Sequence, residues 1–294
     1  MTISYRIILI FLGLTACLYP LGLWLLVRLQ TASPLMFSVG LAAIGACLIC
    51  RRSPRSLGWG WGSWKYHWIS YLIPLAYCSI AYVAIWWLGL GNWYDQSFID
   101  ALRSGYQVDN WTDGAIIAFR FAVTATVSFA LILPGVLGEE IGWRGLLVPE
   151  LSKSLSFSQV CLISGIIWAV WHWPLMLLGF YKNPEVSIGY QMTCFSLCIV
   201  SMSVVMTYIR YQTGSLWPAV ILHMSHNAFL QKFFTPITES TSNSAWFVDE
   251  FGIALPLMAG IIAVIFWRKG VQKFDRPKKQ PDHTDRQIPQ YSPR

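Results

Sequence analysis

Residues 115–144 read AIIAFRFAVTATVSFALILPGVLGEEIGWR, an apolar run that ends in two adjacent carboxylates and an arginine. A transmembrane helix needs about 20 predominantly apolar residues, and residues 115–137 exceed that length with Arg120 as their one charged side chain. An ionisable group at membrane depth costs at least about 2.5 kcal/mol, so it is usually paired, lines a cavity or takes part in chemistry. The stretch therefore predicts a membrane-spanning helix with functional carboxylates at Glu139 and Glu140.

The whole chain has the composition of a membrane protein. Its 294 residues are 55% hydrophobic and 12% charged, whereas soluble domains carry about 25% charged residues. We predict an all-α fold, a polytopic membrane bundle of about eight transmembrane helices, in one integral-membrane domain over residues 1–272 with a polar core at about 120–230. Residues 273–294 form a basic tail that we expect to be disordered and cytoplasmic. The apolar segments are 7–27, 34–50, 68–90, 115–137, 157–180, 187–209, 216–232 and 251–267.

The charges of the loops predict the orientation of this bundle. The segment 51–67 carries four basic residues and no acid, and 268–279 carries six basic residues, whereas 91–114 carries four aspartates and one arginine. Basic loops face the cytoplasm under the positive-inside rule. Both termini are therefore expected in the cytoplasm of a protein integral to the cell membrane. The net charge of +7 then favours contact with anionic lipid headgroups in the bilayer and gives no reason to expect a nucleic-acid partner.

The two carboxylates after residue 137 are expected to have different roles, because neighbours on a helix point about 100° apart. Glu140 and Arg144 stand at i and i+4, the spacing of an ion pair along one helix face. We assign this pair to structural support of the site. Glu139 has no expected partner close in sequence, which suits a general base, and it is placed near the cytoplasmic end of its helix. The alternative, a Glu139 that only reaches headgroup water, leaves the histidines of later segments unexplained.

Those histidines lie in two further apolar segments. His172 follows Trp168 by one helical turn, and His223 and Asn227 stand at i and i+4 on one helix face, with His226 on a neighbouring face. A single His or Asn in a membrane helix is more often a hydrogen-bonding contact between helices. Several such groups on three apolar segments favour a functional site.

These residue types support hydrolysis of an amide. Glu139 and His172 can activate a water, and His223 and Asn227 can donate hydrogen bonds to a developing oxyanion. Alternatively, Glu139, His172 and His223 can hold a zinc ion with one position open for water, although the His-Glu-x-x-His motif is absent. No serine or cysteine stands in an obvious nucleophile context, so attack by water is favoured over a covalent intermediate.

The order of these polar groups resembles that of a known family, the CPBP intramembrane proteases. This family includes the type II CAAX prenyl endopeptidases and bacteriocin-processing or self-immunity (Abi-like) proteins. Its signature is matched over residues 120–230, except that Trp168 stands where phenylalanine is usual. The three motifs are Glu139-Glu140-x-x-x-Arg144, Trp168-x-x-x-His172 and His223-x-x-x-Asn227.

The resemblance implies an intramembrane endopeptidase that cleaves a small membrane-anchored peptide, CAAX-like or bacteriocin-like, near the cytoplasmic face. It implies that Glu139 and His172 activate water and that His223 and Asn227 bind the oxyanion. It leaves the metallo- and glutamic-type mechanisms open. The alternative function is a non-proteolytic scaffold or a proton-coupled carrier that retains the fold. A carrier would be expected to have two related halves, which the sequence does not show.

Overall fold

The computed structural model describes residues 3–275, and within this range the chain is helical, with one isolated bridge between Asn92 and Glu239. The predicted all-α membrane bundle is confirmed. Part of the predicted tail, from residue 276 on, lies outside the described residues. The main helices are α1 Ile3–Leu29, α2 Ser33–Ile49, α3 Trp64–Trp87, α4 Gln96–Tyr106, α5 Asp113–Val123, α6 Phe129–Glu140, α7 Val148–Leu151, α8 Phe157–Leu177, α9 Ile188–Thr213, α10 Trp217–Phe229, α11 Thr235–Ile237 and α12 Ala254–Phe274.

Each of the predicted apolar segments is a helix, with ends shifted by a few residues in most cases. Among the described residues, 6 helices are long and apolar enough to cross a membrane by length and composition. The other two predicted spans are α2, with 17 residues, and the helical run Trp217–Ile237, in which π-helical residues Leu230–Phe234 join α10 to α11. The second run carries His223, His226 and Asn227, whose polarity lowers its mean hydropathy.

The fourth apolar segment differs most from its prediction. Asp113–Leu151 is one helical run of 39 residues, in which π-helical turns Thr124–Ser128 and Ile141–Leu147 join α5, α6 and α7. A π-turn accommodates an extra residue without ending the helix and is frequent at functional sites. Glu139 was expected near the cytoplasmic end of its helix. The predicted end of the helix is wrong, because the run continues to Leu151.

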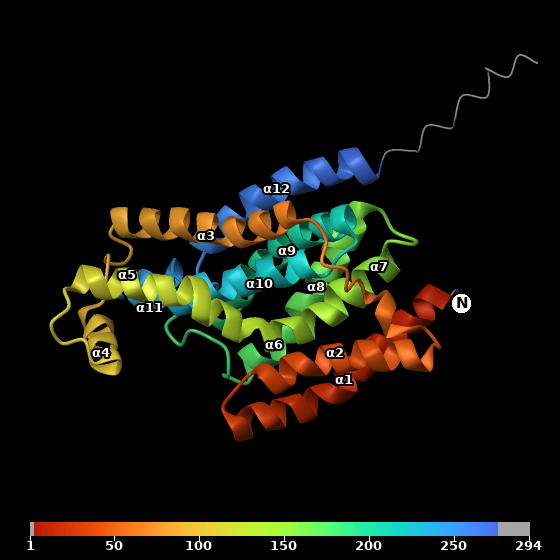
Figure 1. Cartoon of the computed structure of the whole chain (residues 1–294), viewed down its shortest axis with the longest axis horizontal. Helices are drawn as coiled ribbons and strands as arrows, with labels where there is room; N and C mark the ends of the chain where they lie inside the picture. The colour runs from red at the N-terminus through yellow and green to blue at the C-terminus, as the bar shows by residue number, and fades with distance from the viewer. Residues whose placement is uncertain (1–2, 276–294) are drawn as a thin grey trace, which may run out of the picture.

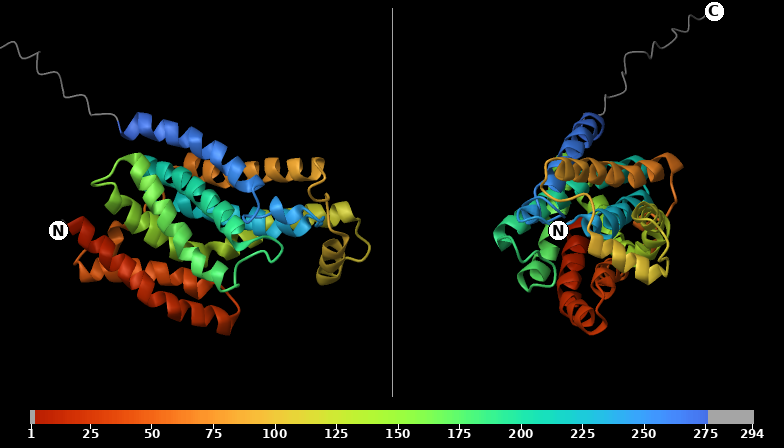
Figure 2. Two further views of the ribbon diagram at one scale, coloured as in Figure 1. Left: turned by 180° about the vertical axis from the view of Figure 1, so that it is seen from behind. Right: turned by 90° about the vertical axis from the view of Figure 1, so that its left-hand side faces the viewer.

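The helices form a bundle with two distinct ends. α1 begins and α12 ends at the same end (Figures 1 and 2). We call this the basic end; it also carries the connections 50–63, 152–156 and 214–216. The opposite end, which we call the acidic end, carries the connections 30–32, 88–112, 178–187 and 238–253. The connection 88–112 contains the short helix α4 (Figure 1). The loops that were expected on one side of the membrane thus lie at one end of the bundle.

Close packing of α2 against α6 positions the carboxylates. A Cβ on Gly138 would lie 2.9 Å from the backbone of Phe37, and one on Gly40 would lie 2.7 Å from the carbonyl oxygen of Gly138. Small residues allow membrane helices to approach this closely. Gly138 immediately precedes Glu139, so this contact holds the backbone of the candidate site.

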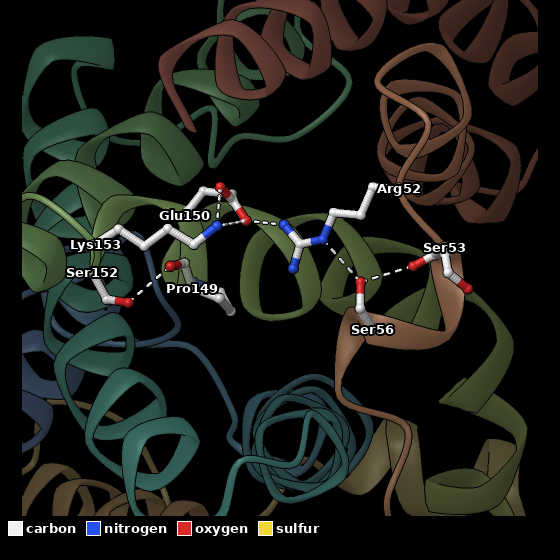
Figure 3. A network of polar contacts seen from close by, with 7 residues as sticks. All are labelled: Arg52, Ser53, Ser56, Pro149, Glu150, Ser152 and Lys153. Atoms are coloured by element: carbon white, nitrogen blue, oxygen red, sulfur yellow. Dashed lines mark hydrogen bonds and ion pairs between the residues drawn. The ribbon is translucent and has the colours of Figure 1, made fainter. Parts of the chain in front are cut away.

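An ion-pair network at the basic end holds the other end of the same helical run (Figure 3). The buried Glu150 of α7 pairs with Arg52, from the connection between α2 and α3, and with Lys153 Nζ at 2.7 Å. Arg52 Nε also donates to Ser56 Oγ at 2.9 Å. The helical run that carries Glu139 is therefore held near Gly138 by packing against α2, and at its Leu151 end by the ion pairs of Glu150.

Candidate active site

The four predicted catalytic side chains line one cavity of about 170 Å³ inside the bundle. Glu139 comes from α6, His172 from α8, and His223 and Asn227 from α10. Much of the remaining wall is apolar, with Leu35, Met36, Leu175, Phe195, Ile199 and Met202 among its residues. The arrangement brings together, from three helices, the residues that the sequence motifs single out.

Glu139 is almost fully buried, with 1% of its surface exposed. Its Oε2 accepts a hydrogen bond from Trp168 Nε1 at 2.8 Å and a longer one from Trp143 Nε1 at 3.3 Å. A buried carboxylate requires such donors, because an unsatisfied charge in an apolar interior is very costly. Glu139 was expected to have no partner close in sequence. That expectation is wrong, because Trp143, four residues on, donates to it, and the two indole N–H groups together orient the carboxylate. A phenylalanine at position 168 could not supply the shorter of these bonds.

Glu140 is fully buried and contacts two cationic or potentially cationic groups through one oxygen. Arg144 NH1 lies 3.0 Å from Oε1 of Glu140, and His223 Nδ1 lies 2.9 Å from the same atom. The Arg144 guanidinium also lies 4.2 Å from the centroid of the Trp168 ring, a cation–π contact that helps to compensate for its burial. The spacing along the helix predicted the partner Arg144; the second partner, His223, comes from α10.

The contact with Glu140 orients His223. A carboxylate only accepts hydrogen bonds, so Nδ1 of His223 carries the hydrogen. Its other nitrogen, Nε2, is not engaged by Glu140. An imidazolium next to this carboxylate can donate from Nε2 to an oxygen that becomes negative. Asn227, half-buried on the next helical turn, lines the same cavity.

His172 is oriented by its own helix. Its Nδ1 lies 3.0 Å from the carbonyl oxygen of Trp168, which only accepts, so Nδ1 donates and Nε2 of the neutral ring is an acceptor. The ring packs beside Trp171, with centroids 4.7 Å apart, and Phe195, at 4.9 Å. His172 thus lines the cavity with Nε2 as a hydrogen-bond acceptor, and its ring is held between aromatic side chains.

A further histidine and a further carboxylate line the cavity, and the sequence motifs assign neither. His226 has Nδ1 2.5 Å from the Tyr77 hydroxyl. Its Nε2 has no hydrogen-bond partner among residues 3–275 and lies 3.6 Å from Oε2 of Glu250. Glu250 is 3% exposed, and its Oε1 accepts from Gln231 Nε2 at 2.7 Å. Glu250 lies in the connection 238–253, where its charge was used only to predict orientation; no pattern in the sequence places it at the cavity.

The zinc alternative concerns Glu139, His172 and His223. Within residues 3–275, no three His, Cys, Asp or Glu side chains already form a group that could hold a metal ion. The contacts described above use Oε2 of Glu139 and the Nδ1 atoms of the two histidines. A histidine can bind a metal through Nε2 while Nδ1 donates to a carboxylate or a carbonyl, so zinc binding by these residues stays a prediction.

Comparison with known proteins agrees with the motifs. Residues 120–229 match the family model of the type II CAAX prenyl endopeptidase Rce1-like proteins. The chain is also 28% identical over 148 residues to a CAAX prenyl protease 2 of Methanococcus maripaludis, a match that covers 49% of this chain and 52% of the relative. The chain thus spans about half the length of this curated relative. Over residues 120–229 the chain is therefore similar to the Rce1-like type II CAAX prenyl endopeptidases, in agreement with the resemblance of its motifs to the CPBP intramembrane proteases.

Proposed function

We propose that this protein is an intramembrane endopeptidase that hydrolyses a peptide bond of a small membrane-associated peptide through an activated water. The observation that carries the proposal is the convergence of Glu139, His172, His223 and Asn227 on one cavity. The name of the archaeal relative, CAAX prenyl protease 2, supports the same reaction class. A CAAX-like or bacteriocin-like peptide with a membrane anchor is the proposed substrate.

Water activation is assigned to Glu139 and His172. The Glu139 carboxylate takes a proton from the water as its oxygen attacks the carbonyl carbon. The indole donors of Trp143 and Trp168 hold the Oε2 side of this carboxylate, so its orientation is set before the substrate enters. His172 Nε2, left as an acceptor by the bond from Nδ1 to a backbone carbonyl, holds the second hydrogen of the water.

Oxyanion binding is assigned to His223 and Asn227. As the new C–O bond forms, the carbonyl oxygen becomes negative, and the Nε2–H of His223 and the side-chain amide of Asn227 donate to it. Glu140 accepts from Nδ1 of His223 at 2.9 Å and holds the ring in this orientation. When the tetrahedral intermediate collapses, the C–N bond breaks and Glu139 delivers its proton to the leaving nitrogen.

The proposal is tested by cleavage of candidate membrane peptides by purified protein. Wild type is compared with Glu139→Gln, His223→Ala and the control Glu185→Gln, which changes an exposed carboxylate outside the cavity. We expect cleavage by wild type and the control, and loss in the two site variants. Equal turnover in all four proteins would refute the assignment. Turnover in none, on farnesylated CAAX-type peptides and on bacteriocin-like leader peptides alike, would favour the non-proteolytic scaffold or carrier. Metal analysis before and after chelation tests the zinc alternative.

A further inference from the structure

We propose that Glu250 forms a second binding subsite in the catalytic cavity, which takes a positively charged side chain of the substrate peptide. Glu250 would then determine specificity, whereas Glu139 performs the chemistry. The inference rests on the proposed function, because it requires a peptide substrate. Both proposed substrate classes can carry a lysine or an arginine beside the bond that is cut. The assignment follows from the burial, the partners and the charge of Glu250.

The carboxylate of Glu250 lies in the wall of the cavity and has no strong cationic partner. It is 3% exposed, and its Oε1 accepts from the neutral amide of Gln231 at 2.7 Å. Within residues 3–275 no lysine or arginine forms an ion pair with it, and the nearby imidazole of His226 has Nε2 3.6 Å from its Oε2. A buried carboxylate is costly unless an opposite charge compensates for it. The charge of Glu250 is therefore available to a bound cation.

His226 adds an unpartnered ring nitrogen beside this carboxylate. The ring is 1% exposed and lines the cavity, and its Nε2 has no hydrogen-bond partner in the described part of the chain. The 3.6 Å separation from Glu250 Oε2 is too long for a hydrogen bond between the two. The Tyr77 hydroxyl, 2.5 Å from Nδ1, can accept as well as donate, so a neutral ring can present Nε2 as an acceptor. Two acceptors side by side suit an ammonium or a guanidinium, which carries several donors.

The surrounding charges favour a cation over a neutral polar group. Burial and the charge of Glu250 raise the pKa of the adjacent Asp249 to about 7, so Glu250 is the member of this pair that ionises at the lower pH. Among residues 3–275, the side chains that line the cavity include two carboxylates, Glu139 and Glu250, and no lysine or arginine. A hydroxyl or an amide of the substrate would leave the charge of Glu250 uncompensated, whereas a basic side chain neutralises it.

The apolar part of the cavity suits the stem of such a side chain. Lysine and arginine bury their methylene stems along apolar surface while the charged head reaches a polar group. Apolar residues line much of the cavity, among them Phe195, Ile199 and Met202. Tyr181 joins the subsite to the water-activating residues, because its hydroxyl lies 3.3 Å from Gln231 Nε2 and its ring centroid lies 6.4 Å from that of His172. The basic residue of the substrate should therefore lie close in sequence to the bond that is cut.

Peptides that differ in one charge test the subsite in the wild-type protein. Membrane-anchored reporter peptides carry lysine, norleucine or glutamate at one position, which is moved in turn along the residues that flank the cleaved bond. Norleucine keeps the apolar stem and removes the charge. At one position we expect kcat/KM to be higher for lysine than for norleucine by about tenfold or more, the scale of one charge-assisted hydrogen bond, and lowest for glutamate. Equal values for lysine and norleucine at every position would overturn the proposal and would indicate that His226 already serves as the cationic partner of Glu250.

Variants of the protein identify the carboxylate that is responsible. Glu250→Gln should abolish the preference for lysine. Glu239→Gln, the same change at an exposed carboxylate of the same connection outside the cavity, should keep it. Glu250→Asp retains the charge but withdraws it by one methylene, so it should reduce the preference in part, and it serves as the test if Glu250→Gln does not fold. A full preference for lysine in Glu250→Gln or in Glu250→Asp would overturn the assignment.

Binding without turnover separates the subsite from the protease function. Fluorescently labelled lysine and norleucine peptides are titrated with purified Glu139→Gln protein in detergent, and their anisotropy is measured. We expect a Kd about tenfold lower for the lysine peptide, and equal Kd values in Glu139→Gln/Glu250→Gln. A lysine preference in binding, with no cleavage by wild type, would leave the subsite as assigned and count against the proposed protease function alone. Cleavage by wild type without any lysine preference would remove the subsite and leave the protease function.

Discussion

His223 Nδ1 lies 2.9 Å from Oε1 of Glu140, the oxygen that Arg144 NH1 contacts at 3.0 Å. One buried carboxylate oxygen therefore joins an ion pair within its own helix to a histidine of α10. Without Glu140, the Arg144 guanidinium would have no counter-ion at this position, and His223 would lose the group that orients its ring. Glu140 thus supports the site both by pairing with Arg144 and by orienting His223, and the helix spacing indicated only the first of these contacts.

Replacing this carboxylate should cost both stability and activity. Glu140→Gln leaves a buried arginine without its charge partner, so we expect a loss of about 3–5 kcal/mol in the free energy of unfolding, measured by thermal or denaturant unfolding in detergent, together with loss of peptide cleavage. In Glu140→Gln/Arg144→Met the unpaired charge is gone, so stability should recover in part. Activity should not recover, because His223 still lacks its anionic partner. A fully active double variant would contradict the role of the Glu140–His223 contact.

Glu139→Gln should separate catalysis from folding. The amide keeps the size of the side chain and an oxygen that can accept from Trp168, but it cannot take a proton from water. We expect cleavage to fall by at least about 100-fold, in line with the loss of a general base, with little change in the unfolding transition. Single-turnover cleavage and circular dichroism measure the two effects. Residual activity within a few-fold of wild type would remove Glu139 from the role of base.

The two indole donors should contribute unequally to turnover. Trp168→Phe removes the 2.8 Å bond to Glu139, and Trp143→Phe removes the 3.3 Å bond. Hydrogen bonds to charged groups contribute about 1.5–3 kcal/mol, so we expect about a tenfold fall in kcat for Trp168→Phe and a smaller fall for Trp143→Phe. Steady-state kinetics on one peptide compares them. A larger effect of Trp143→Phe would show that Trp168 does not orient the carboxylate.

Gly138→Ala should destabilise the bundle by displacing α2. The added Cβ would lie 2.9 Å from Phe37 Cα and 3.0 Å from the carbonyl oxygen of Met36, and overpacking of this kind typically costs about 1–3 kcal/mol. Gly13→Ala is the matched control, since a Cβ there has no heavy atom within 4 Å. Unfolding in detergent should show a loss for Gly138→Ala and none for Gly13→Ala. Equal stability of the two variants would mean that α2 can shift without cost.

Asp249 should make the stability depend on pH. Burial, together with the charge of the adjacent Glu250, raises the pKa of Asp249 to about 7, whereas an unfolded aspartate titrates near about 3.9. Between these values the folded state binds more protons than the unfolded state, so stability falls as pH rises through this window. Asp249→Asn, which also suits the positive φ of 68°, should flatten that fall. Melting temperatures of both proteins between about pH 4 and 8 test this; parallel curves would contradict it.

The sequence by itself determined the class of fold and the identity of the main polar groups. Apolar runs such as 157–180 and 187–209 predicted helices close to those observed, because the length of an apolar run is a local property that the bilayer demands. The motifs singled out Glu139, His172, His223 and Asn227, because ionisable groups in such runs are too costly to be incidental. Loop charge sorted the connections into two sets, and these occupy opposite ends of the bundle.

The tertiary structure alone decided how these groups meet. The helix continues past Glu139, with Gly138 packed against α2, and the donor to Glu139 from Trp168 comes from 29 residues away. The His223 contact with Glu140 spans 83 residues, and Glu250 reaches the cavity from a connection with no pattern of its own. Such contacts depend on the rotation and crossing of whole helices, which many weak packing interactions set together. For this reason the sequence predicted the candidate residues, whereas the packing of the helices decided their partners.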